Sequence, residues 1–378
     1  MEQNKTRQPD YRFKLLYAFG MIIVVSCHAG DGGMNLFYDW FSPYAYILSL
    51  FAFCSGYFFK AASAEDIPGF LRRKLRTLLL PLYLWNFFYG LLVLALRPLG
   101  FTIGLMPDFR TLLLMPLYEG SQFEYNMASW FVAPLFFVEL FNVLFRRVFA
   151  VSRSRRRELL CFFVYLLLGL LGVWLARSGF RRGWEQALVR TLYFLPFYGL
   201  GILYKRVLEP LDRLPHTVYF ALVFLAQYLL IIVLGHIPAY TISRCDNFND
   251  GLLTPFLAGA VGIAFWLRVA KLLEPTLGRD RWLNAIADNS FSIMTNHFLG
   301  FFVIKSGFAL LQHFTSRAAN FDPVLFKTDL MYYYVPGGRV FYLFYLAAGL
   351  AFPILLQRLL HLVSLRLRRR RGSRAAVG

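Results

Sequence analysis

Three polar side chains, His28, Asn296 and His297, lie inside apolar stretches that contain few other ionisable or amide groups. Such groups are costly at membrane depth, and they usually face a protein interior or a wet cavity. A neutral imidazole can accept a proton from a hydroxyl group near pH 7, so a histidine is the natural general base for acyl transfer to an alcohol. A lone histidine in an apolar helix is about as often a hydrogen-bonded structural residue, so both roles stay open for His28.

Two further pairs have a helical spacing of three residues, which places both members on one helix face. Glu139 and Asn142 would orient a histidine or bind substrate, or else hold neighbouring helices together, and the structural role is slightly favoured. Arg73 and Arg76 precede an apolar run. Two guanidinium groups there would clamp the phosphates of a nucleotide-bearing acyl donor. An ordinary cytoplasmic anchor is the more frequent explanation of such a pair.

Metal binding is not expected from the histidines and cysteines. His28 and His297 are far apart in sequence, and no cysteine or second carboxylate is spaced to complete a ligand set. The four cysteines have no disulfide or zinc-like spacing, and three lie in apolar runs, where they act as small buried side chains. Cys27 is expected to point to another helix face than His28 and to serve packing.

The composition requires that lipid solvates much of the chain. Of the 378 residues, 58% are hydrophobic and only 16% are charged, and the mean hydropathy is +0.51. A soluble domain has about 25% charged residues. Runs of about 20 apolar residues are long enough to span a membrane. Ten such runs predict transmembrane helices at 13–29, 44–61, 77–96, 128–145, 159–176, 187–204, 217–236, 252–270, 283–304 and 340–363.

The distribution of basic residues predicts the orientation. The chain has 40 Lys and Arg against 21 Asp and Glu, a net charge of +19. With ten helices and both termini in the cytoplasm, 29 of the 40 basic residues fall on the cytoplasmic side, as the positive-inside rule requires. The same rule explains the net charge without nucleic-acid binding. We therefore expect an all-α polytopic membrane protein that forms one domain over 1–378, with a basic cytoplasmic tail at 364–378.

Two long outer segments, about 97–127 and 305–339, mix aromatic, glycine, proline and acidic residues. They could form caps over a membrane cavity, where aromatic rings would stack on sugars and a carboxylate such as that of Glu124 would accept hydroxyl hydrogen bonds. For the tyrosine run 332–334, an interfacial aromatic belt explains the pattern equally well.

Five segments, in order along most of the chain, resemble the acyltransferase-3 family of membrane O-acyltransferases, particularly its sugar O-acetylase-like branch. The family's motif residues fall on His28 in 14–28, Ser55-Gly56 in 49–59, Arg73 and Arg76 in 72–86, Ser129-Trp130 in 129–139, and Ser290 and His297 in 287–302. The resemblance implies a cytoplasmic acyl-CoA donor, usually acetyl-CoA, and an acceptor hydroxyl on a surface or lipid-linked saccharide.

The sequence departs from the family at one position that matters. Eleven residues before the histidine the family commonly has Arg or Lys, and this chain has Tyr17. Three residues before that position, where the family often has an acidic residue, this chain has Lys14. Either Arg12 or Lys14 substitutes from another helical turn, or the donor is handled differently.

The resulting hypothesis places the thioester of acetyl-CoA in a cavity between the first, fourth and ninth predicted helices. His28 would remove the acceptor proton, and Asn296 or Trp130 would donate a hydrogen bond to the oxyanion. An alternative makes His297 the base and His28 its orienter. Donor-binding candidates are Arg73, Arg76 and Lys14, and acceptor or cavity candidates are Trp130, Glu139, Asn142, Ser290 and Glu124.

Direct transfer is preferred to an acyl-enzyme, because no serine or cysteine is paired with a base in the sequence. The expected location is a bacterial cytoplasmic membrane, with membrane lipids as further partners. The rival interpretation is a glycan exporter in which the buried His and Glu residues relay protons. Transporters often have internal repeats, and the two halves of this sequence have none that we can recognise.

Overall fold

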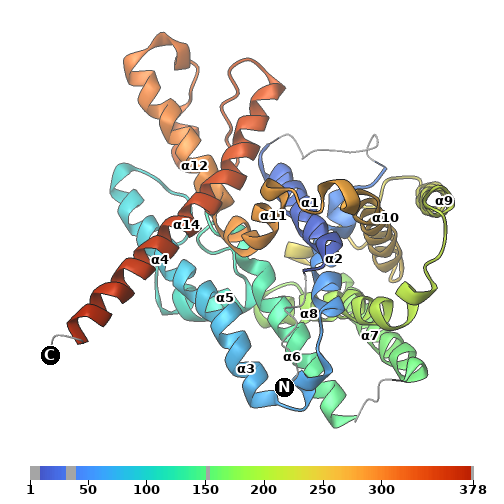
Figure 1. The fold of residues 1–378 in the computed structure, drawn as a ribbon. Coiled ribbons are helices and arrows are strands. Elements are labelled where there is room, and N and C mark those ends of the chain that lie inside the picture. Colours follow the sequence, from blue (N-terminus) through green and yellow to red (C-terminus); the bar gives the residue numbers. More distant parts are fainter. Residues whose placement is uncertain (1–8, 31–39, 150–153, 376–378) are drawn as a thin grey trace.

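The computed structural model describes residues 9–30, 40–149 and 154–375, and this part of the chain is almost entirely helical (Figure 1). Helices make up 78% of the protein, and the described residues form no β-strand. The elements in chain order are α1 (Tyr11–His28), α2 (Pro43–Tyr57), α3 (Ile67–Lys74), α4 (Leu80–Leu96), α5 (Met115–Tyr118), α6 (Val132–Val148), α7 (Arg155–Arg177), α8 (Gly183–Leu203), α9 (His216–Leu234), α10 (Thr254–Leu277), α11 (Arg281–Asp288), α12 (Ser290–Phe314), α13 (Pro323–Thr328) and α14 (Tyr342–Ala375).

Each of the ten predicted spans falls on a helix, and the protein is an all-α, multi-pass membrane protein. Eight helices of the described chain are long and apolar enough to cross a membrane. Helices α1 and α2 are not among these eight; α2 has only 15 residues, of which 12 are buried. The count of ten spans and the cytoplasmic position of both termini stay predictions.

The predicted helix 283–304 is wrong in its boundaries. The chain breaks after Asp288, so α11 and α12 are separate, and α12 continues to Phe314. The break has a local cause: the Asn289 side chain donates back to the Ala285 carbonyl at the end of α11. Asparagine and aspartate side chains that bond nearby backbone groups favour such helix ends.

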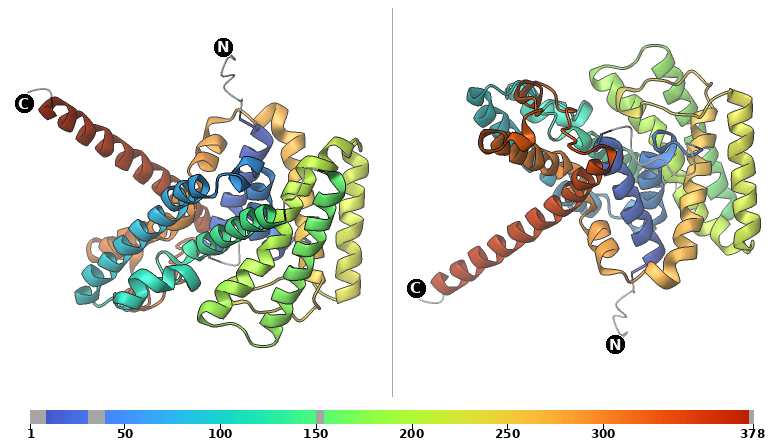
Figure 2. Two further views of the ribbon diagram at one scale, coloured as in Figure 1. Left: turned by 90° about the horizontal axis from the view of Figure 1, so that it is seen from below. Right: turned by 90° about the horizontal axis from the view of Figure 1, so that it is seen from above.

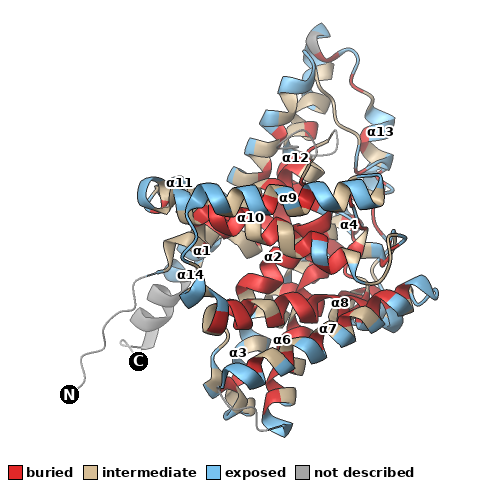
Figure 3. Cartoon of the chain, turned by 90° about the vertical axis from the view of Figure 1, so that its right-hand side faces the viewer, coloured by how far each residue is buried: buried red, intermediate tan, exposed pale blue. Residues whose placement is uncertain are grey.

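Helices α1 and α2 lie in the centre of the molecule, and α9 and α14 lie at its edge (Figure 1). In Figure 3, α9 crosses in front of α10 and turns a largely exposed face outward. In the most apolar window of α9 only 11% of the residues are buried by protein, whereas in the segment that contains α8 the share is 78%. The C-terminal half of α14 projects away from the other helices (Figure 2). The apolar windows of both edge helices are largely uncovered by protein, which is the surface expected of helices that lipid solvates.

Glycines allow α2 and α8 to cross at very short range. A Cβ atom added at Gly56 would lie 1.9 Å from the Tyr198 carbonyl oxygen, and one at Gly201 would lie 2.0 Å from the Phe53 carbonyl oxygen. Small residues at such crossings let helix backbones pack closely in membranes. Packing therefore explains the glycine of the Ser55-Gly56 motif.

Candidate functional site

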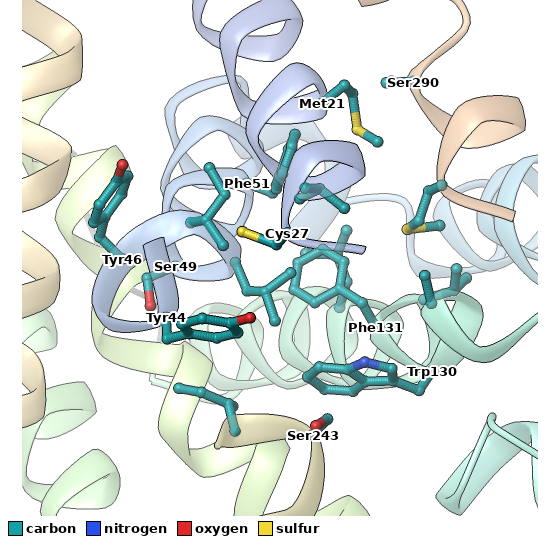
Figure 4. A pocket seen from close by; sticks show the side chains of 18 of the residues that line it. Met21, Cys27, Tyr44, Tyr46, Ser49, Phe51, Trp130, Phe131, Ser243 and Ser290 are labelled. Atoms are coloured by element: carbon teal, nitrogen blue, oxygen red, sulfur yellow. The ribbon is translucent and has the colours of Figure 1, made fainter. Parts of the chain in front are cut away.

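The cavity that His28 lines, referred to below as the main cavity, has a volume of about 330 Å³ and lies between α1, α2, α6, α12 and the turn 240–243 (Figure 4). Its walls are mostly apolar and aromatic. On α1 the lining residues include Tyr17, Met21, Val24 and His28, which follow one helix face. The cavity thus extends along α1 as far as its last residue, His28.

The structure brings His28 and His297 into direct contact. His297 is the eighth residue of α12, and its Nε2 lies 3.0 Å from the Nδ1 of His28. The two rings are nearly parallel, with 11° between their planes. The other nitrogen of His297, Nδ1, lies 2.8 Å from the carbonyl oxygen of Ile293, one helical turn earlier.

These contacts determine where the protons lie in a neutral pair. A carbonyl oxygen only accepts, so the Nδ1 of His297 must carry the hydrogen and its Nε2 must be an acceptor. The Nδ1–H of His28 then donates to that acceptor, which leaves the Nε2 of His28 with an unshared electron pair. His28 lines the main cavity, whereas His297 is completely buried and does not. His28 is therefore the member of the pair that can take a proton from a bound molecule.

The outer segment holds the end of α1 in place. The Tyr333 hydroxyl donates to the backbone carbonyl of His28. Burial raises the pKa of the Tyr333 hydroxyl, so the donor hydrogen is retained. Lys305, buried in α12, donates to the Leu330 carbonyl at 2.8 Å, and its ammonium lies 5.0 Å from the Tyr333 ring centre. In this structure Tyr333 therefore positions a helix end, a role that neither the sugar-cap nor the aromatic-belt interpretation foresaw.

Trp130 lies on the cavity wall just before α6. Ser129 donates to the Gly120 carbonyl at 3.2 Å, and Gly120 has a positive φ of 76°. A Cβ atom at Gly120 would lie 2.4 Å from the Cα of Trp130, so only glycine fits against the Ser129-Trp130 motif. No described residue accepts a hydrogen bond from the Trp130 indole, which leaves this donor available to the cavity.

Asn296 does not reach the main cavity, so the structure does not support it as the oxyanion donor. Its side chain is fully buried. Its amide donates to the Ser292 carbonyl at 3.0 Å and to the Thr295 hydroxyl at 2.9 Å, while its oxygen accepts from Tyr89 at 2.8 Å. The donor capacity of Asn296 is therefore used within its own helix.

Glu139 and Asn142 also lie outside the residues that line the cavity. Glu139 accepts from Ser55 at 2.7 Å and forms an ion pair with Lys74 at 2.5 Å. Asn142 accepts from Tyr165 and Arg146, each at 2.9 Å. Of the two roles that the sequence left open, these contacts fit the joining of helices.

The donor candidates fall in two different places. Lys14 and Ser290 line a second cavity of about 400 Å³, where Lys14 forms an ion pair with Asp288 at 3.0 Å. Tyr17 and Ser290 line both cavities, so they lie at the boundary between them. Arg73 and Arg76 are exposed and line neither cavity, and Arg73 donates to Ser63 at 3.2 Å. Lys14 and Ser290 thus line the same cavity, whereas Arg73 and Arg76 do not line it.

The structure also places two further single residues, Cys27 and Glu124, for which a role was predicted from the sequence. Cys27 lines the same cavity as His28, although consecutive residues of a helix point about 100° apart, so its predicted packing role stays a prediction. Glu124 is exposed, has a φ of +36°, and accepts from the Gly104 amide at 3.4 Å. It lines neither described cavity, so its predicted role at the acceptor site has no support from this geometry.

Three features of the site were not predicted from the sequence: Arg190, Lys305, and the cavity wall that α2 and the turn 240–243 supply. Both basic residues could have been found with the depth criterion that selected His28. Arg190 lies inside the predicted span 187–204, and Lys305 directly follows the predicted span 283–304. Among the described residues, no three His, Cys, Asp or Glu side chains are placed to share a metal ion.

Comparison with known families agrees with the resemblance found in the sequence. Residues 10–358 match the acyltransferase-3 family, whose description is an acyltransferase domain. The match covers nearly the whole chain and does not distinguish between branches of the family. No curated protein and no solved structure matches the chain.

Proposed function

Because the chain belongs to the acyltransferase-3 family, we propose that it is an O-acyltransferase that transfers an acyl group from cytoplasmic acyl-CoA to a saccharide hydroxyl. The donor is acetyl-CoA, or another acyl-CoA, and the saccharide is lipid-linked or part of the cell surface. The observation that carries this proposal is the unshared electron pair on the Nε2 of His28 at the cavity wall.

The proposed donor path runs through the second cavity into the main one. Lys14 would bind a phosphate of the coenzyme in place of Asp288, its present partner. The thioester arm would then pass between Tyr17 and Ser290, which border both cavities. Arg73 and Arg76 remain exposed, so they would act as a cytoplasmic docking site outside the path.

The proposed reaction is a direct transfer. The Nε2 of His28 takes the acceptor's hydroxyl proton while the hydroxyl oxygen attacks the thioester carbonyl carbon. The resulting tetrahedral intermediate collapses, the carbon–sulfur bond breaks, and the coenzyme thiolate receives the proton from His28. The products are the ester and free coenzyme A. His297 stabilises the imidazolium by accepting from its Nδ1–H throughout.

Trp130 is the proposed oxyanion donor. Its indole N–H lies on the cavity wall without an acceptor among the described residues. A preorganised donor of this kind lowers the barrier because it stabilises charge that develops only in the transition state. Cys27 also lines the main cavity, but in the described structure no hydrogen bond joins its thiol to the His28 imidazole, so direct transfer remains preferred to an acyl-cysteine.

The exporter interpretation is weakened by the position of Glu139. A proton relay would need the buried carboxylate and the histidines to communicate. Glu139 instead pairs with Lys74 and Ser55, and it does not line the cavity that contains His28. We retain the bacterial cytoplasmic membrane as the proposed location, with lipids around α9 and α14.

The test uses purified protein in nanodiscs, acyl-labelled acetyl-CoA and longer acyl-CoAs, and a panel of saccharide acceptors. We expect label to move to a saccharide in the parent protein, and His28→Ala to lower kcat about 10³-fold, within the range of general-base catalysis. His216→Ala, at the exposed start of α9, is the matched control and should retain full activity. A folded parent that neither binds nor consumes any acyl-CoA would refute the proposal.

A further inference from the structure

Arg190 is a buried cation without a carboxylate partner in the described structure. It lies on α8 and is only 2% exposed. No Asp or Glu of the described residues forms an ion pair with it. A buried, unpaired charge in a membrane protein is costly, and it usually indicates a function.

The guanidinium of Arg190 binds backbone carbonyls of two separate segments. Its Nη1 donates to the Tyr118 and Glu119 carbonyls at 3.0 and 3.1 Å, and its Nη2 donates to the Ser243 carbonyl. The Nε–H has no acceptor within the part of the chain that the structure describes. A planar fork of donors can reach acceptors on different sides at once, which a lysine cannot do. Arg190 therefore ties the segment after α5 to the turn 240–243.

The same guanidinium lies over the face of Trp130, with its central carbon 4.5 Å from the ring centre. Trp130 and Ser243 line the main cavity, whereas Arg190 does not. Figure 4 shows Trp130 and Ser243 at the same side of the cavity. A cation over an indole ring is attracted by its electrons. The cation also withdraws electron density from the ring nitrogen, which makes the N–H a stronger hydrogen-bond donor.

We propose that Arg190 is a positioning residue that fixes the Trp130 indole and strengthens its N–H as the donor to the oxyanion. This inference rests on the proposed function. When the acceptor oxygen adds to the thioester, the carbonyl oxygen gains the negative charge, and it loses that charge when the carbon–sulfur bond breaks. Arg190 keeps its proton throughout and acts only through Trp130.

Arg268 provides a matched comparison within the same protein. It is also buried, at 3% exposed, donates to the Leu214 carbonyl at 3.1 Å, and lies 3.7 Å from the centre of the Tyr219 ring. Unlike Arg190, it has a carboxylate partner, Asp212, and neither Tyr219 nor Leu214 lines the main cavity. Arg268 thus has the contacts expected of an arginine that only stabilises the fold.

The first experiment is a double-mutant cycle between Arg190 and Trp130. We expect Trp130→Phe to lower kcat about 10²-fold, as the loss of one oxyanion donor does, with the KM for acyl-CoA within about twofold of the parent value. Arg190→Gln should lower kcat about tenfold when Trp130 is present and have almost no effect in the Trp130→Phe background. Arg268→Lys should reduce thermal stability and leave kcat per folded molecule unchanged. If Arg190→Gln does not fold, Arg190→Lys replaces it in the cycle.

The second measurement does not depend on activity. The indole N–H resonance of Trp130, identified by its loss in Trp130→Phe, should move in Arg190→Lys and stay in place in Arg268→Lys. An unmoved resonance overturns the inference, whether or not any acyl transfer is found. Equal loss of kcat from Arg190→Gln in both Trp130 backgrounds also overturns it. Absence of transfer by the parent, together with a moved resonance, counts against the proposed reaction and supports the contact between Arg190 and Trp130.

Discussion

Two buried polar clusters in this protein differ in how completely their members are paired. In the first, Arg146 binds both carboxylate oxygens of Glu158 at 3.0 and 2.7 Å, and Arg206 pairs with the same carboxylate. Asn142 and Tyr165 extend this cluster across α6 and α7. In the second cluster, at the main cavity, His28 and His297 form one hydrogen bond, and the Nε2 of His28 has no partner among the described residues.

The difference separates a structural role from a chemical one. Charges that neutralise one another inside a protein have no remaining capacity to bind a substrate, and breaking their pairing is costly. An imidazole nitrogen that faces a cavity without a partner can act on a bound molecule. The two clusters therefore predict opposite effects of substitution: the first should affect folding, and the second should affect catalysis.

The largest expected effect is on stability, from Arg146→Met. This change leaves the carboxylate of Glu158, which is only 2% exposed, with Arg206 as its remaining cation. Loss of one partner of a buried pair costs about 3–5 kcal/mol, and Arg206 should keep the cost near 3 kcal/mol. Equilibrium unfolding in detergent measures this change, and kcat per folded molecule should be unaffected.

The double variant Arg146→Met with Glu158→Met serves as the control for this prediction. It also removes the buried carboxylate of Glu158, so it should recover part of the lost free energy of unfolding. A selective loss of kcat in the single variant, without a change in stability, would mean that the cluster belongs to the active site.

The next effect in size is on catalysis, from replacement of His297. Phe at this position keeps a ring but cannot accept from the Nδ1–H of His28, so kcat should fall about 10²-fold, as for a loss within a general-base system. Gln keeps an acceptor and should lose only about tenfold. Steady-state kinetics at saturating donor measures both. If the two variants lose activity equally, acceptance of the His28 proton is not the role of His297.

The sequence predicted the helices well because apolar runs and basic loops follow directly from the membrane as solvent. The break after Asp288 was missed, because Asp288 and Asn289 lie inside a run that otherwise looks like one span. Helix caps act over a few residues, and an apolar window of 20 residues averages them out.

The candidate site was predicted in part. His28 and His297 were both selected because a polar residue in an apolar run stands out from the residues around it. Residue type does not tell which helix face a side chain occupies. For that reason Asn296 was selected as an oxyanion donor, although its side chain does not reach the main cavity. Arg190 met the same criterion as His28 and could have been selected. The turn 240–243 could not, because it is a loop that only the tertiary fold brings to the cavity.

The smallest expected effect comes from Tyr333→Phe. Tyr333 contacts the cluster formed by His28 and His297 from outside, so this change tests whether catalysis also depends on residues around the cluster. The change removes one hydrogen bond to the His28 carbonyl, worth about 1 kcal/mol, so kcat should fall about fivefold if α1 ends less rigidly. Tyr332→Phe is the matched control, because the Tyr332 oxygen accepts from the Asp322 amide at 2.7 Å within the same outer segment and does not contact His28. The control should lose a similar amount of stability and keep its kcat. Equal kcat in both variants would show that the end of α1 is held by its packing against α12, without help from the Tyr333 hydroxyl.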